Sequence, residues 1–97
     1  QLVFDSAQHF EELIAAQDYE LATSFVESML NNINEDKGTI SVIEAFFEEE
    51  DTIYDFEIEK LNFISNFKEF LTIYEREEDY EGCLVISNAI KTLEGQA

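Results

Sequence analysis

The sequence predicts an all-α protein: a small single-domain bundle of about five helices, arranged as helical hairpins. The chain contains no Pro and only three Gly, which favours long helices over a β fold rich in turns. Apolar side chains recur at intervals of three and four residues along most of the chain, as on the buried face of a helix. A chain of 97 residues buries somewhat over ~60% of its unfolded surface, so we expect one domain over residues 1–97.

The first third of the chain predicts a short arm and two helices. Residues 1–4 are mostly apolar and are expected to form a strand or an extended arm on the core. Asp5 or Ser6 can cap the helix that follows, because their side-chain oxygens accept hydrogen bonds from the first helical N–H groups. We expect this helix to break near Gln17–Asp18, where the Asp caps a second helix over residues 19–33.

The middle of the chain predicts a loop and a third helix. Residues 34–38 read Asn-Glu-Asp-Lys-Gly, which is the clearest turn composition in the sequence. Thr39 can cap a helix over residues 40–50. Residues 51–55 either break this helix or let it continue to residue 60.

The last third predicts the fourth and fifth helices. The fourth carries a wide apolar stripe of the kind that faces a core: Phe63, Ile64, Phe67, Phe70, Leu71 and Tyr74. A polar turn follows, Asp79 caps the fifth helix, and Gly95 ends it. The apolar face of the fifth helix is expected to bury Cys83, Ile86, Ile90 and Leu93.

An internal similarity connects the two predicted hairpins. Residues 18–22 and 79–83 share the pattern Asp-Tyr-Glu-x-small at an offset of 61 positions. This start resembles the second helix of tetratricopeptide hairpins, and residues 79–93 resemble the helical hairpin of the UVR motif. The Trp and Pro signature of the former is absent, and residues 86–88 (Ile-Ser-Asn) replace the Leu-Arg-Asp core of the latter. The resemblance therefore implies hairpin geometry and no function.

The charge of the chain is its most unusual property. Asp and Glu number 23 against five Lys and Arg, which gives a net charge of −18. Residues 1–59 contain 16 of the acids and a single base, Lys37. Such a chain repels nucleic acid and anionic membranes and attracts basic surfaces. The sequence therefore predicts a basic protein surface as partner, with no direct contact to nucleic acid or membrane.

The candidate partner-binding residues lie in the most acidic stretch, between positions 39 and 60. They are Glu44, Glu48, Glu49, Glu50, Asp51, Asp55 and Glu59. If residues 40–60 form one helix, five of these carboxylates share one face at spacings of 4, 3, 4 and 4 residues. If the helix breaks at residues 51–55, they form an acidic corner. A third interpretation is an ordinary solvated face that keeps the protein in solution.

Metal and cofactor sites are not predicted. Residues 33–44 place Gly38 and Glu44 at the positions that a calcium-binding EF-hand loop requires. However, Ile33 occupies the position of the first Asp ligand, and Lys37 occupies another ligand position. We therefore expect no metal ion and no cofactor.

Catalysis is also not expected. His9 and Cys83 are the single His and the single Cys, and they fall in separate predicted helices. The sequence contains no Gly-rich phosphate loop and no nucleophile motif. We therefore expect a protein that is not an enzyme.

The compartment and the function follow from the same composition. The single Cys83 excludes an intramolecular disulfide, and no signal peptide or apolar run of ~20 residues is visible, so a cytoplasmic location is expected. The first functional hypothesis is an inhibitor, immunity protein or nucleic-acid mimic that occupies a basic surface of a nuclease or another nucleic-acid-binding protein. The alternative is an interaction or assembly subunit that binds through an apolar Phe and Tyr patch, with the charge serving solubility.

Overall fold

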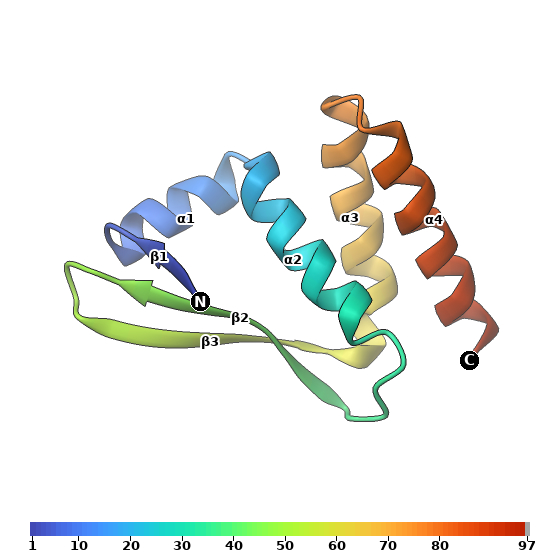
Figure 1. Ribbon diagram of the computed structural model, residues 1–97, viewed down its shortest axis with the longest axis horizontal. Helices are drawn as coiled ribbons and strands as arrows, with labels where there is room; N and C mark the ends of the chain where they lie inside the picture. The colour runs from blue at the N-terminus through green and yellow to red at the C-terminus, as the bar shows by residue number, and fades with distance from the viewer. Residues whose placement is uncertain (97) are drawn as a thin grey trace.

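The computed structural model describes residues 1–96 and has a mixed α/β fold, so the prediction of an all-α bundle of five helices is wrong. Four α-helices, one short 3₁₀ helix and a three-stranded sheet make up the described chain (Figure 1). In chain order they are β1 (Leu2–Phe4), α1 (Ala7–Ala15), α2 (Tyr19–Asn31), β2 (Thr39–Phe47), β3 (Thr52–Glu59), η1 (Lys60–Asn62), α3 (Phe63–Arg76) and α4 (Tyr80–Gly95).

The error lies in the stretch expected to form the third helix, which is the hairpin β2–β3. This stretch is rich in β-branched and aromatic residues, which pack well on a pleated sheet. In β3, apolar Tyr54, Phe56 and Ile58 alternate with acidic residues, the period of a strand with two different faces. Such a segment buries its apolar side chains on a sheet, whereas a helix of the same sequence would spread them around its circumference.

The sheet has the strand order β1-β2-β3. β1 pairs with β2 in parallel, with Leu2 opposite Ala45, and β2 pairs with β3 antiparallel, with Glu44 opposite Asp55. A β-bulge between Ser41 and Ile43 shifts the register of β2 by one residue. Of the two alternatives expected for residues 1–4, a strand or an extended arm, the structure has the strand, β1, at one edge of the sheet.

The helices lie on one side of this sheet (Figure 1). The sheet residues that point toward them are buried and include Ile40, Ile43, Ala45 and Phe47. Phe10 of α1 fills the space above, with its ring centroid 5.7 Å from that of Phe47. This aromatic packing fixes α1 over the sheet. No helix of residues 1–96 covers the opposite face of the sheet.

The second part of the core lies among α2, α3 and α4. Phe63 and Phe67 of α3 are fully buried, and Phe25 of α2 stacks on Phe70 at 5.8 Å between ring centroids. α4 packs along α3 as an antiparallel hairpin (Figure 1). The stripe predicted for α3 is therefore its core face, and the positions predicted for α4 are buried, apart from the half-buried Cys83.

Three predicted helix starts are confirmed by their caps. Ser6 accepts a hydrogen bond from the His9 N–H at 3.0 Å, and Asp18 and Asp79 accept from N–H groups three residues ahead, each at 2.9 Å. The residues before the two Asp caps, Gln17 and Glu78, have left-handed φ angles of 53° and 57°. The internal similarity therefore corresponds to two helix–helix turns of the same build, and the break near Gln17–Asp18 is confirmed.

Candidate interaction surface

The sheet face that lies opposite the helices collects the four acidic side chains of the strands β2 and β3. Residues directly opposite each other in a register share one face of a sheet. This rule places Glu44 and Asp55 together on the face without helices, and the two-residue period adds Glu57 and Glu59. All four side chains are exposed. We call these four residues the carboxylate row and their side of the sheet the outer face.

The structure therefore brings together only some of the residues predicted to form a binding face. Glu44, Asp55 and Glu59 belong to the carboxylate row, whereas Glu48 and Asp51 lie in the turn between β2 and β3. The predicted spacing of 4, 3, 4 and 4 residues along one helix is wrong because the stretch is not helical. Glu57 was missed as a site residue, although its place in the strict alternation of β3 could have identified it.

The acidic turn is built into the fold by hydrogen bonds. The N–H groups of Glu48 and Glu49 donate to the carbonyl oxygens of Phe4 and Asp5, at 3.0 and 2.9 Å. The Glu50 carboxylate accepts from the Ala7 N–H at 3.2 and 3.3 Å. A carboxylate in this position stabilises the N-terminus of α1, where helical N–H groups lack partners. Glu50 therefore contributes to the fold at the start of α1.

Apolar side chains adjoin the carboxylate row near the turn. Val3, Phe46 and Ile53 come from three neighbouring strands and share the outer face by register. Val3 and Ile53 are each 57% exposed, and Phe46 is half-buried. The outer face therefore offers an apolar patch next to its carboxylates, a combination that the spacing of residues within one segment does not predict.

No cation of residues 1–96 is paired with the carboxylate row. Within these residues the one salt bridge joins Arg76 to its neighbour Glu77 at 3.1 Å. Arg76 also donates to the Gln17 carbonyl at 2.7 Å, and Lys60 donates to the Glu35 carbonyl at 2.6 Å. These two bases bind backbone oxygens at helix or loop ends, and no salt bridge within residues 1–96 neutralises a carboxylate of the row.

A polar cluster joins the two helix–helix turns on the other side of the molecule. The Tyr19 hydroxyl donates to the Asp79 carboxylate at 2.5 Å, and the Gly82 N–H donates to the same side chain. The hydrogen bond from Tyr19 lowers the pKa of Asp79 below its usual value, and the bond from the Gly82 N–H adds a smaller effect in the same direction. The bond to Asp79 raises the pKa of Tyr19, and burial raises the pKa of Tyr74 to about 12. The cluster holds α2 against the start of α4.

The two side chains considered for catalysis lie apart. His9 is exposed on α1, and Cys83 is half-buried on α4. Burial, with smaller contributions from Glu75 and Asp79, raises the pKa of the Cys83 thiol, which lowers the fraction of reactive thiolate at neutral pH. Residues 1–96 contain no group of three His, Cys, Asp or Glu side chains arranged to hold a metal ion.

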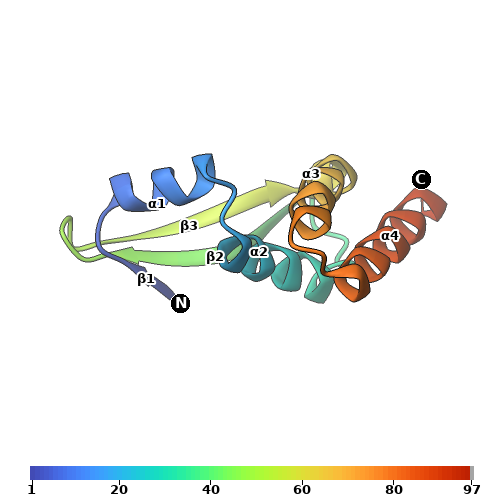
Figure 2. The same cartoon turned by 90° about the horizontal axis from the view of Figure 1, so that it is seen from above.

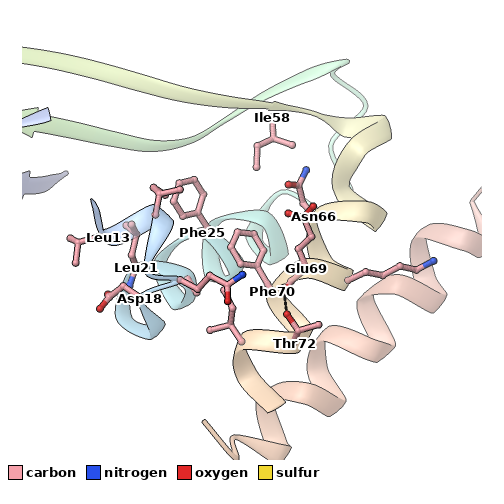
Figure 3. Close-up of a pocket in the computed structure, with 14 residues that line it drawn as sticks. Leu13, Asp18, Leu21, Phe25, Ile58, Asn66, Glu69, Phe70 and Thr72 are labelled. Atoms are coloured by element: carbon pink, nitrogen blue, oxygen red, sulfur yellow. Dashed lines mark hydrogen bonds between the residues drawn. The ribbon is translucent and has the colours of Figure 1, made fainter. Parts of the chain in front are cut away.

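A groove of about 720 Å³ opens on the helical side of the sheet, between α1, α2, β3 and α3, and its lining is partly apolar and partly polar, with Asn66 and Glu69 among the polar side chains (Figure 3). Its apolar lining includes Leu13 and Ile14 of α1, Phe25 of α2, Ile58 of β3 and Phe70 of α3. Figure 3 shows Ile58 on one side of this groove and Phe25 and Phe70 on the other. The groove therefore lies beside β3, on the face opposite to the carboxylate row.

Within the part of the chain that the structure describes, no helix is both long and apolar enough to cross a membrane. Comparison with known proteins adds no relative to these observations: no protein-family model, no curated protein and no solved structure matches this chain.

Proposed function

We propose that this chain is an acidic, non-enzymatic binding protein, an inhibitor, immunity protein or nucleic-acid mimic. Its partner is a basic surface of a nuclease or another protein that handles nucleic acid. The observation that carries this proposal is the carboxylate row, four exposed side chains on a sheet face without helices or paired cations from residues 1–96. Within this proposal we place the protein in the cytoplasm, because its single Cys83 forms no intramolecular disulfide.

The spacing of the row supports mimicry of a phosphate backbone. Asp55, Glu57 and Glu59 follow each other at two-residue intervals along β3, which corresponds to roughly 6.6–6.8 Å between neighbours. This spacing is of the same order as that of successive phosphates on a nucleic-acid strand. A groove lined by Lys and Arg for phosphate contacts would meet a comparable series of negative charges.

The pairing of Glu44 with Asp55 supports a role in binding over a role in folding. Like charges directly opposite each other on a sheet are destabilising, and this pair has no salt-bridge partner among residues 1–96. A cationic surface that covers the outer face would remove this repulsion. Part of the binding free energy would then come from relief of strain that the free protein carries.

The neighbouring apolar patch supports a specific interface. Val3, Phe46 and Ile53 would be covered by the same partner that contacts the carboxylate row. Interfaces usually combine an apolar centre with a polar rim. The charges would give a fast and salt-sensitive association, and the apolar contacts would slow dissociation.

The alternative is an interaction or assembly subunit that binds through apolar contacts. None of the nine Phe side chains is fully exposed, and the half-buried Phe46 belongs to the apolar patch of the outer face. The outer side of α4, however, carries Tyr80 at 70% and Leu84 at 63% exposure, with Val85 beside them. Under the alternative, this surface of α4 binds the partner, and partner binding is then expected to be insensitive to salt.

Capture of partners from the native lysate separates these two hypotheses. The immobilised protein is incubated at roughly 0.05 and 0.5 M NaCl, between which exposed charges become strongly screened. We expect basic nucleic-acid-binding proteins to be retained at low salt, lost at high salt and displaced by added DNA or heparin. Partners that bind equally at both salt concentrations and resist displacement would contradict mimicry and favour the apolar surface of α4.

A further inference from the structure

β3 has a free edge. It is the last strand in the order β1-β2-β3, and it is eight residues long. Figure 2 shows β3 as the outer strand on the side of α1, with α1 and α3 near its two ends. Within residues 1–96, no backbone hydrogen bond joins the outward edge of β3 to another element. Such an edge presents a row of unpaired N–H and C=O groups.

The register identifies which residues face this edge. The Lys60 N–H donates to the Gly38 carbonyl at 2.8 Å, so the backbone at Lys60 points toward β2. Successive residues of a strand direct their backbone groups to opposite sides. Asp55, Glu57 and Glu59 therefore direct their backbone N–H and C=O groups away from β2, toward the free edge.

The two faces beside this edge differ in chemistry. On the outer face, the side chains of Asp55, Glu57 and Glu59 are exposed carboxylates. On the helical side, the apolar side chain of Ile58 borders the groove of about 720 Å³, and Tyr54 is 53% exposed. A strand added to β3 would thus place alternate side chains beside carboxylates and beside apolar surface.

We propose that β3 accepts an extended segment of the partner as a fourth, antiparallel strand, in which Lys or Arg alternates with apolar residues. The basic side chains would lie against Asp55, Glu57 and Glu59, and the apolar side chains would cover Tyr54 and enter the groove beside Ile58. Backbone hydrogen bonds supply affinity in such strand addition, and the alternate side chains supply specificity. This inference rests on the proposed function, because it specifies how the basic partner is recognised.

A second copy of this chain does not fit the same edge. Two β3 strands paired antiparallel would bring the three carboxylates of one copy against the three of the other on one face. Like charges directly opposite each other are destabilising, and charged side chains on edge strands commonly prevent self-association. The charge of β3 therefore selects a basic segment and rejects its own sequence.

Two synthetic peptides of equal composition test the alternation. The first reads Lys-Val-Lys-Ile-Lys-Val-Lys, and the second carries the same residues as a block, Lys-Lys-Lys-Lys-Val-Ile-Val; both are acetylated and amidated. Titration of the full chain at low salt is expected to show affinity for the first peptide at least about tenfold above that for the second. Equal affinities, or no detectable binding of the first peptide, would overturn the inference.

N-methylation of the first peptide tests the strand pairing without altering the protein. Lys residues opposite Asp55, Glu57 and Glu59 direct their N–H groups at β3, so methylating these nitrogens removes several hydrogen bonds. We expect a loss of roughly tenfold or more, whereas methylation of the apolar residues should leave the affinity nearly unchanged. Hydrogen exchange at Asp55, Glu57 and Glu59 should slow when the unmodified peptide binds. Equal effects of the two methylations, or unchanged exchange, would contradict strand addition.

A separate measurement tests the proposed function: the affinity of the native partner for a variant whose carboxylate row is neutralised. If that variant loses the partner while the peptides show no preference, the edge inference fails and the proposed function stands. If that variant keeps the partner, the proposed function fails and the edge inference fails with it.

Discussion

Glu44 and Asp55 stand directly opposite each other on β2 and β3, and this pair connects stability with binding. We expect Glu44→Gln to raise the free energy of unfolding by roughly 0.2–1 kcal/mol, because it removes repulsion between like charges on one face. Urea unfolding at low salt measures this effect. The control Glu11→Gln, at an exposed position on α1, should change stability less. Destabilisation by Glu44→Gln would show that the pair is structural.

Asp79 is the residue whose protonation should matter most for the turns. Its hydrogen bonds from Tyr19 and the Gly82 N–H hold its pKa below the usual value of 3.8. Because the folded pKa is lowered, the stabilisation is fully present above pH 3.8 and is lost as the pH falls through the folded pKa. Asp79→Asn should therefore destabilise the protein by a constant amount from above pH 3.8 to neutral pH, and by less below pH 3.8. A difference that does not change with pH would contradict this account.

At the scale of elements, the helix–helix turns depend on residues with left-handed φ angles. Glu78 has φ 57°, whereas its neighbour Glu77 has φ −85°. Gly adopts the left-handed region without the clash that other residues suffer there, so Glu78→Gly should raise the melting temperature. Glu77→Gly, the control in the same turn, should lower it, because it adds chain entropy to the unfolded state and removes the exposed ion pair with Arg76. Thermal unfolding measures both, and equal shifts would contradict the turn geometry.

The helices could be predicted from the sequence because their signals are local. Asp18 and Asp79 mark caps, and the apolar spacing of α3 marks its buried face. The hairpin was missed for identifiable reasons. The bulge at Ser41–Ile43 interrupts the alternation of β2, and the turn at residues 48–51 contains no Gly, Asn or Pro. Its left-handed residue is Asp51, with φ 50°, which tolerates this conformation better than most side chains.

The candidate site could be predicted only in part, because the acidic residues were expected on one face of a helix and lie on a sheet. The acidic stretch was identified correctly as a concentration of charge, and three of its predicted residues share the outer face. These residues lie close together because Glu44 pairs with Asp55 across two strands. The periodicity within one segment cannot show such a pairing. The apolar patch was missed for the same reason, because Val3 comes from a strand some 40 positions away in the sequence from Phe46.

At the scale of the whole molecule, a net charge of −18 is spread over a thin body of 43 × 32 × 17 Å. Self-repulsion of this charge opposes folding, and salt screens it within a Debye length of about 10 Å at 0.1 M. We therefore expect NaCl to raise the melting temperature while it weakens partner binding. Thermal unfolding and titration over the same salt series measure the two effects. Parallel changes of stability and affinity would contradict a binding mode based on charge.

The most direct test compares the native partner's affinity for two variants of equal net charge. One neutralises the carboxylate row (Glu44→Gln, Asp55→Asn, Glu57→Gln and Glu59→Gln). The other neutralises four exposed acids on the helices (Glu11→Gln, Glu27→Gln, Glu75→Gln and Glu94→Gln). Titration at low salt should show at least about a tenfold loss for the first variant and a much smaller loss for the second. Equal losses would mean that only the total charge matters, and would contradict the outer face as the binding surface.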